Sequence, residues 1–324
     1  MSDLNRVTVL AGGLSHERDV SLRSGRRVAE ALREAGVEVD VRDVDANLVG
    51  ALTRDRPDAV LPVLHGVNGE DGALRSVLEL LEVPYVGTTP AACRIAFDKP
   101  TAKTLVAAAG VATPDAVALP HETFRELGAA ALLDAIVARL GLPLVVKPAR
   151  GGSALGLAVV ARPEELTGAM VGAFAYGSTA LVERFVSGTE VAVSVIDVGD
   201  GPRALPAVEI VPDSGLYDYT ARYTAGMTEF FVPARLPQAA AAAAAELAVA
   251  AHRALGLRDF SRSDLIVDAA GTGWFLEVNV APGMTETSSF PMAVAAEMLD
   301  LGALMCDLLA AAVSRGGAAL SGRR

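Results

Sequence analysis

Four polar residues in the last quarter of the chain have the side-chain types of a magnesium site. Asp264 and Glu277 supply carboxylates, and Asn279 supplies an amide oxygen. Arg262 adds a guanidinium beside them. Mg²⁺ favours hard oxygen ligands and usually keeps substrate phosphates as the rest of its shell. Two adjacent carboxylates without a cation would repel each other. These residue types therefore predict a magnesium site, provided that the fold brings them together.

A β-hairpin is the element that must do so. Two strand-like runs flank the segment AAGTG, whose glycines suit a tight turn. If the turn centres between the second and third residues of that segment, Asp264 faces Glu277 across the hairpin. The same register pairs Arg262 with Asn279, and side-chain alternation puts all four on one face. The alternative is an exposed hairpin edge whose opposite charges merely pair. A slip of one residue would undo the prediction.

A second candidate group is the glycine-rich segment KPARGGSALG, residues 147–156. Its glycines allow successive N–H groups to form an anion-binding nest over phosphates, although it is not a Walker A loop. Only Lys99, Lys103 and Lys147 are lysines among the 28 basic residues. Lys147 has a compact ammonium group, suited to contact with phosphate, in a chain whose other basic residues are nearly all arginine. The same argument makes Lys99 a candidate phosphate ligand. The alternative is an ordinary flexible turn.

Further candidates lie in loops. Glu17 follows the first expected strand and His65 ends the third, where open α/β sheets bind ligands. A lone histidine at a strand end is more often packed or hydrogen-bonded than catalytic. The tyrosines of GLYDYTARY, residues 215–223, either cover a site as a lid or simply pack down. The polar loop 281–289 can bring N–H groups and hydroxyls close to a ligand.

The spacing of apolar residues predicts a parallel, helix-covered sheet in the first hundred residues, and then α+β units. Asp98 followed by Pro100 predicts a helix N-cap, where we place the first boundary. The expected units are residues 1–98, 99–186 and 187–324. The expected strands include 6–11, 37–44, 58–65, 83–86, 114–119, the run PLVVKPA before the glycine-rich segment, TALVERFV, 190–198, 204–211, 260–268 and 274–280, and the expected helices include 22–34 and 101–109.

Composition limits the class of protein. The chain has 324 residues, 52% of them apolar, which is enough for two or three domains and a substantial core. A net charge of −11 repels phosphate backbones and anionic lipid, so nucleic-acid and membrane partners are not expected. Cys93 and Cys306 form no metal or redox spacing, and no signal peptide or membrane span is visible. We therefore expect a cytoplasmic protein.

Seven segments, taken together and in order, resemble the D-alanine:D-alanine ligases of the ATP-grasp superfamily. They are GGLSHERDVSLRSG, LHGVNGEDG, FDKPTAK, VVKPARGGSALG, YDYTARY, SRSDL and LEVNVAPGMT. The resemblance implies an N-terminal Rossmann-like domain, a small central domain and a larger C-terminal domain, with ATP between the last two. It also implies a homodimer that makes D-alanyl-D-alanine for peptidoglycan synthesis.

The resemblance implies roles for individual residues. Those implied to contact ATP are Lys99, Lys147, Gly152, Ser153, Glu183, Phe185, Val186, Glu190, Arg222 and Leu276, with Glu183 and Glu190 at the adenine and ribose ends. Those implied to bind two Mg²⁺ ions, or Mn²⁺ in their place, are Asp264, Glu277 and Asn279. Those implied to bind the amino acids are Glu17, His65, Arg262, Gly283 and Ser288. Glu17, Ser153 and Tyr223 would form a hydrogen-bonded triad that closes a loop over the site, and Arg262 with the Gly283 N–H would form an oxyanion hole.

The implied reaction begins when the carboxylate of one D-alanine attacks the γ-phosphate, and the second amine then attacks the acyl phosphate. A lid would keep water from the intermediate. Three positions depart from the common pattern: Arg222 replaces lysine, Ala154 replaces serine, and Val280-Ala281 replaces a more polar pair.

Three alternatives remain at this stage. The first is a ligase that uses D-lactate or D-serine as acceptor, although Tyr223 within YDYTARY favours the dipeptide. The second is a catalytically silent nucleotide-binding protein of the same fold, against which the full set of metal ligands argues. The third is a dinucleotide-dependent oxidoreductase, which the absence of GxGxxG after the first strand weakens.

Overall fold

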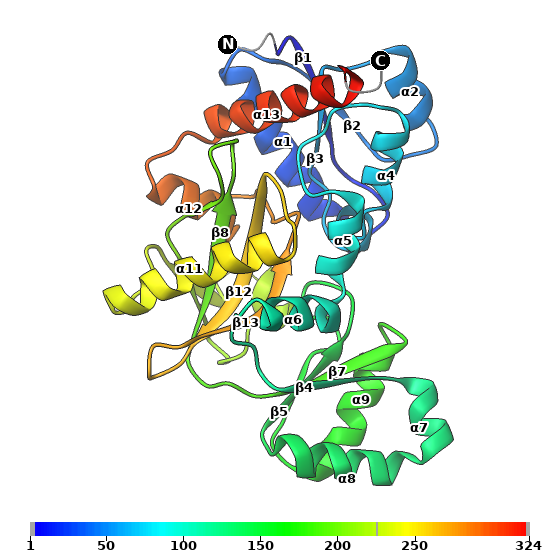
Figure 1. Cartoon of the computed structure of the whole chain (residues 1–324), viewed down its shortest axis with the longest axis vertical. Coiled ribbons are helices and arrows are strands. Elements are labelled where there is room, and N and C mark those ends of the chain that lie inside the picture. Colours follow the sequence, from blue (N-terminus) through cyan, green and yellow to red (C-terminus); the bar gives the residue numbers. More distant parts are fainter. Residues whose placement is uncertain (1–3, 225, 322–324) are drawn as a thin grey trace.

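The computed structural model describes residues 4–224 and 226–321, except the side chains of Tyr223 and of residues 317–321. Three sheets lie one after another along the long axis, and the first and last described elements both lie at the first of them (Figure 1). The sheets have three, six and four strands. One parallel sheet and two antiparallel sheets with covering helices agree with the parallel-sheet unit followed by α+β units that the sequence predicts.

The first sheet is parallel, with strand order β2-β1-β3. Its elements are β1 (Arg6–Leu10), α1 (Arg18–Glu34), β2 (Glu38–Arg42), α2 (Leu48–Arg54), β3 (Ala59–Pro62), α3 (Val67–Glu70), α4 (Ala73–Leu80) and α5 (Pro90–Phe97). The prediction of a fourth strand at 83–86 is wrong. Only an isolated bridge between Val60 and Tyr85 forms there, because Pro84, which precedes Tyr85, has no N–H with which to extend the ladder.

The small sheet is antiparallel, with order β4-β7-β5-β6. Its elements, after α6 (Lys99–Ala108), are β4 (Ala116–Pro120), α7 (His121–Leu127), α8 (Ala129–Leu140), β5 (Leu144–Pro148), β6 (Ala158–Val160), the 3-10 turn η1 (Pro163–Glu165), α9 (Leu166–Phe174) and β7 (Thr179–Arg184). The predicted cap of α6 is confirmed, since the Asp98 side chain accepts a hydrogen bond of 3.0 Å from the Thr101 N–H.

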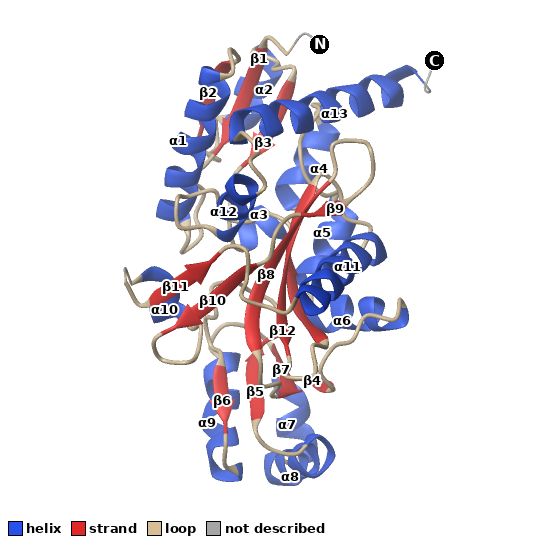
Figure 2. Ribbon diagram, turned by 90° about the vertical axis from the view of Figure 1, so that its left-hand side faces the viewer, coloured by secondary structure: helices blue, strands red, loops and turns tan. Residues whose placement is uncertain are grey.

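The large sheet runs through the middle of the molecule, with order β11-β10-β8-β12-β13 and β9 paired to β8 (Figure 2). Its elements are β8 (Thr189–Ile196), β9 (Arg203–Ala204), β10 (Val208–Pro212), α10 (Tyr219–Tyr223), β11 (Thr228–Phe231), α11 (Gln238–Ala254), β12 (Phe260–Val267), β13 (Gly273–Asn279), α12 (Ser289–Ala296) and α13 (Leu301–Ser321). The strand expected at 204–211 is interrupted at Pro206. The alanines of α11 form its buried stripe, which lets the helix lie close against β8 and β12.

The hairpin register is confirmed at the four predicted residues. Asp264 pairs with Glu277 and Arg262 with Asn279. The turn itself differs, because Val267 pairs with Gly273, one residue out of step with the site. A β-bulge after Asp264 absorbs the extra residue. The predicted pairing is therefore right at the site, although the assumed centre of the turn was wrong.

Helix α13 returns to the first sheet, where it packs against α1 and β3 (Figure 1). Its buried residues Met305, Leu308 and Leu309 share one apolar core with Val9 and Leu61. The last helix of the chain therefore closes the layer around the first sheet. Within the described residues, no helix is long and apolar enough to cross a membrane.

Candidate active site

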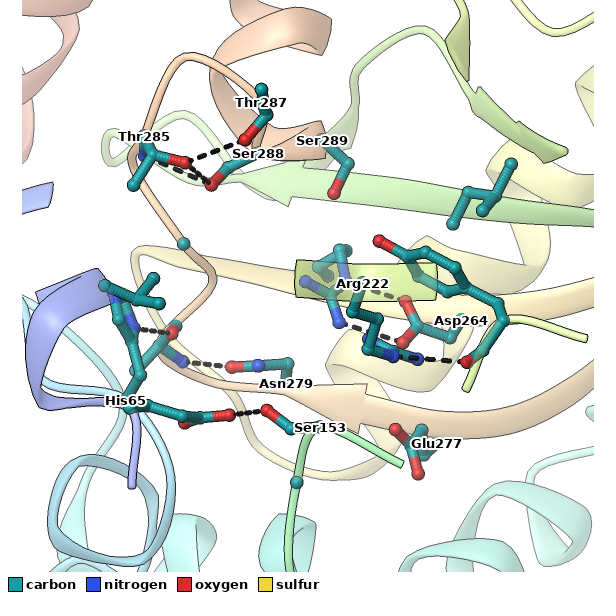
Figure 3. Close-up of a pocket in the computed structure, with 18 of the residues that line it drawn as sticks. His65, Ser153, Arg222, Asp264, Glu277, Asn279, Thr285, Thr287, Ser288 and Ser289 are labelled. Carbon is teal, nitrogen blue, oxygen red and sulfur yellow. Dashed lines mark hydrogen bonds and ion pairs between the residues drawn. The ribbon is translucent and has the colours of Figure 1, made fainter. Parts of the chain in front are cut away.

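Two adjoining cavities lie between the three sheets. The smaller has a volume of about 340 Å³ and the larger about 490 Å³. Lys99, Asp264, Glu277 and Arg222 line both, so the cavities meet at the acidic hairpin. Figure 3 shows Asp264 and Glu277 near one another on this wall. Apart from Tyr223, whose side chain lies outside the described residues, every predicted site residue lines one cavity or both.

The hairpin face combines acidic and basic groups in ordered contacts. Arg262 donates to both oxygens of Asp264, at 2.7 and 2.9 Å. Lys99 Nζ lies 3.5 Å from a Glu277 oxygen. Burial alone would raise the pKa of Glu277, but Lys99 and Lys147 outweigh it and lower that pKa to about 2. Glu277 is therefore ionised at neutral pH.

These oxygens fit a magnesium ion. The two Arg262 contacts use one lone pair on each Asp264 oxygen, and the Ala281 N–H uses one on the Asn279 amide oxygen at 2.7 Å. Each oxygen keeps a second lone pair. No group of three or more His, Cys, Asp and Glu suited to a metal occurs among the described residues. Two carboxylates and an amide are nevertheless sufficient for Mg²⁺, whose shell is completed by water and substrate phosphates.

Residues of the glycine-rich segment line both cavities. Lys99 Nζ donates to the Gly151 carbonyl at 2.6 Å. Ser153 and Ala154 both adopt φ of 55°, a left-handed conformation that costs energy for residues with a Cβ. The Ser153 hydroxyl donates to Glu17, which joins this segment to the first sheet. Two members of the predicted triad are thus in contact.

His65 links the first sheet to the loop after β13. Its Nδ1 lies 2.8 Å from the Ala281 carbonyl and its Nε2 lies 3.1 Å from Ser24 Oγ. The Met284 N–H donates to the same Ser24 oxygen at 3.1 Å. Burial lowers the pKa of His65 to about 4, so the ring is neutral and carries its proton on Nδ1, toward the carbonyl.

Gly283 and Ser288 depend on each other in that loop. A Cβ at Gly283 would lie 2.6 Å from Ser288 Oγ, so any side chain there must displace the serine. Ser288 Oγ also accepts from the Thr285 N–H at 3.1 Å. The pair Val280-Ala281 is buried, which explains its apolar character, while the Ala281 backbone holds Asn279 and His65.

Glu70 is a site residue that sequence analysis missed. It lines the smaller cavity, is 7% exposed and accepts from the Gly66 N–H at 2.9 Å. Burial, aided by the nearby Glu17 charge, raises its pKa to about 8. A carboxyl group at the end of the motif HGVNGE, beside a cavity-lining histidine, was the signal that could have found it.

A buried ion cluster was also missed. Lys147 Nζ lies 2.6 Å from one oxygen of Glu183, and Lys103 Nζ lies 2.8 Å from the other. The carboxylate of Glu183 is therefore engaged by two ammonium groups. The scarcity of lysine, which pointed to Lys99 and Lys147, applies equally to Lys103.

The larger cavity ends in a mixed apolar and acidic wall. Phe185, Val186 and Leu276 line it, with Glu190 beside them. Burial raises the pKa of Glu190 to about 7. Arg222 lies 4.1 Å from the centre of the Tyr217 ring and donates to the Tyr217 carbonyl at 3.3 Å, so the substituted arginine keeps a positive charge where the cavities meet.

Comparison with known proteins identifies the family. Residues 43–88 match the family described as D-ala D-ala ligase N-terminus, and residues 105–310 match D-ala D-ala ligase C-terminus. The D-alanine–D-alanine ligase of Anaeromyxobacter sp. (strain K) is 43% identical over 88% of this chain and 90% of its own. That of Pelotomaculum thermopropionicum is 38% identical over 96% of this chain and 98% of its own.

Solved structures agree with this result. The D-alanine–D-alanine ligase of Bacillus anthracis has a TM-score of 0.81 and 27% identity, covering 97% of this chain and 99% of that one. The VanG D-Ala:D-Ser ligase of Enterococcus faecalis has a TM-score of 0.80 and 29% identity, covering 95% of this chain and 99% of that one. With both halves matched and the cavities lined by the expected residues, this chain belongs to the D-alanine–D-alanine ligase family.

Proposed function

We propose that this chain joins two D-alanine molecules to D-alanyl-D-alanine, with ATP converted to ADP and phosphate, as a step toward peptidoglycan precursors. The observation that carries this proposal is the acidic hairpin shared by two cavities. A phosphate donor in one cavity and a carboxylate in the other would meet at Asp264 and Glu277. A relative of the same family has been solved with ATP bound.

In this scheme the larger cavity holds ATP. Lys147, Lys99 and Arg222 supply positive charge to the phosphates, and Gly152 and Ser153 belong to the segment that covers them. Phe185, Val186 and Leu276 offer apolar contact to the base, and the segment that starts at Glu183 offers its backbone. Glu190 lies at the ribose end. Asp264, Glu277 and Asn279 would hold Mg²⁺, or Mn²⁺ in its place, which stabilises charge on the transferring phosphoryl group.

The smaller cavity holds the amino acids. Glu17 would bind the ammonium group of the first D-alanine, and Ser288 the carboxylate of the second. Arg262 and the Gly283 N–H would stabilise the oxyanion that forms when the second amine attacks the acyl phosphate. His65 fixes the loop that carries Gly283, through Ala281 and Ser24. Glu17, Ser153 and Tyr223 would close the site and keep water from the intermediate.

The test incubates purified protein with MgATP and D-alanine and measures phosphate release together with the dipeptide. We expect equal amounts of phosphate and D-alanyl-D-alanine. Phosphate release without dipeptide would reject the ligase assignment, and a catalytically silent nucleotide-binding protein would release neither.

D-serine is the second acceptor to test, because the VanG D-Ala:D-Ser ligase has nearly the same fold similarity as the D-alanine ligase. Parallel reactions with D-serine and D-lactate measure the preference directly. We propose D-alanine as the acceptor, and a larger kcat/KM for D-serine than for D-alanine would overturn this choice.

We also propose a homodimer and a cytoplasmic location, which the family assignment supports. Sedimentation of the purified protein tests the oligomeric state.

A further inference from the structure

Lys103 is a buried cation next to the active site that touches neither cavity. It is 5% exposed, and it is absent from the described residues that line the two cavities. It lies one helical turn after Lys99 on α6 and therefore shares a face of that helix with it. Burying a charged lysine costs free energy unless an opposite charge pairs with it, so Lys103 is expected to have a buried acidic partner.

The partner is Glu183 on β7. Lys103 Nζ donates to one carboxylate oxygen at 2.8 Å, and Lys147 Nζ lies 2.6 Å from the other. In the pairing of β5 with β7, Glu183 lies opposite Val145, so Lys147 is its diagonal neighbour on the same face. The Glu183 side chain is 3% exposed and those of Lys103 and Lys147 are 6% and 7% exposed. Little water is left to screen their charges.

The three groups carry two positive charges and one negative charge. Burial alone would raise the pKa of Glu183, but the charges of Lys147 and Lys103 outweigh it, so the carboxylate stays ionised. Without Lys103, the whole negative charge of Glu183 would be balanced by Lys147, and the cluster would be neutral. With Lys103, Glu183 is shared and one positive charge remains beside the larger cavity, which Lys147 lines.

We propose that Lys103 is a positioning residue for the nucleotide site: by sharing Glu183, it leaves the charge of Lys147 available to a polyphosphate. The inference rests on the proposed function, in which Lys147 contacts the phosphates of ATP. Lys103 acts on the nucleotide only through Glu183. Its effect should therefore disappear when Glu183 carries no charge.

A double-mutant cycle tests this dependence. Four proteins are compared: wild type, Lys103→Met, Glu183→Gln and the double variant. Calorimetric titration with MgADP gives the dissociation constant, and steady-state assays give KM for ATP and for D-alanine. We expect Lys103→Met to weaken MgADP binding and raise KM for ATP by about 10-fold, the effect of one moderate charge interaction. KM for D-alanine should stay within about twofold, and Lys103→Arg should recover most of the ATP affinity.

The decisive comparison is Lys103→Met made in the Glu183→Gln background. We expect it to change MgADP affinity by less than about twofold, because the shared charge is gone. A loss as large as in the wild-type background would overturn the proposal and assign Lys103 to packing of α6. If Lys103→Met alone does not fold, the comparison in the Glu183→Gln background still tests the proposal. The double variant has no buried carboxylate at position 183 that would lack a partner.

Two controls separate this inference from the proposed function. Arg94→Met removes an exposed positive charge from the neighbouring helix α5 and should leave nucleotide affinity unchanged. Lys147→Met should weaken MgADP binding at least as much as Lys103→Met. If Lys147→Met binds normally, the nucleotide site itself is wrongly assigned. If Lys147→Met binds weakly and Lys103→Met binds normally, only the role of Lys103 fails.

Discussion

The two cavities of this site are built by different means. The larger is lined by charged side chains on strands and a helix, such as Lys147 and Glu183, which sheet pairing brings together. The smaller depends on loops, where His65 and Ser24 hold the backbone of residues 281–284 by hydrogen bonds. Binding in the larger cavity should therefore respond most to changes of side-chain charge. Binding in the smaller cavity should respond most to changes of backbone conformation. Four substitutions test this contrast, beginning with the largest expected effect.

Glu277→Gln removes a carboxylate at the junction of the cavities. We expect kcat to fall by about 100-fold or more, the usual result of losing one group that stabilises transition-state charge. The variant should also unfold at a lower temperature than wild type, because Lys99 and Lys147 stabilise the ionised carboxylate in the folded protein, so turnover is compared well below that temperature. Dipeptide formation at saturating MgATP is the measurement. Glu246→Gln, the same change on the exposed face of α11, is the control. Unchanged turnover in Glu277→Gln would reject the junction as the reaction centre.

Gly283→Ala changes conformation without changing charge. The new Cβ would lie 2.6 Å from Ser288 Oγ and must push it aside, so we expect KM for the acceptor D-alanine to rise about 10-fold, with KM for ATP unaltered. Gly168→Ala, where a Cβ meets nothing within 4 Å, is the matched control. A rise in KM for ATP instead would show that the cavities are not built independently.

His65 predicts a pH dependence of stability. Its pKa falls from 6.5 in the unfolded chain to about 4 in the folded protein, so the unfolded chain binds more protons between these values and stability is lost as pH falls through that window. At pH 5, the free energy of unfolding that is lost through the shifted pKa of His65 is about 2 kcal/mol. In His65→Asn, the urea midpoint should decline less steeply from pH 6.5 to 4.5 than in wild type. His252, whose pKa burial also lowers to about 4, remains as the source of the residual slope. An unchanged slope would mean that His65 is not buried as a neutral ring.

Asp98→Ala gives the smallest effect. It removes the N-cap of α6, the helix that carries Lys99 and Lys103, and should cost about 1 kcal/mol of stability. Because Lys99 and Lys103 act on the nucleotide phosphates in the proposed scheme, any change in KM should be larger for ATP than for D-alanine. Thermal unfolding and steady-state kinetics measure the two effects. Thr89→Ala, which removes the equivalent cap of α5, is the comparison. Equal changes in both KM values would indicate a general loosening of the fold.

The sequence by itself determined what depends on local patterns. Strand and helix periodicity predicted most elements, and Asp98 with Pro100 predicted a helix start, because capping acts within a few residues. The pairing of Asp264 with Glu277 also followed from the sequence, since alternation along two neighbouring strands leaves few registers. The bulge beside Asp264 did not, because it depends on how β12 packs between β8 and β13.

Only the tertiary structure decided the contacts between distant segments. Lys103 and Glu183 are 80 positions apart, and His65 and Ala281 are 216 apart, so no local pattern could pair them. Burial is also a property of the whole fold, and it gives Glu70 a pKa of about 8 and His65 one of about 4. The sequence determines which chemical group each side chain carries, whereas the exclusion of water from a side chain requires the packing of all three sheets.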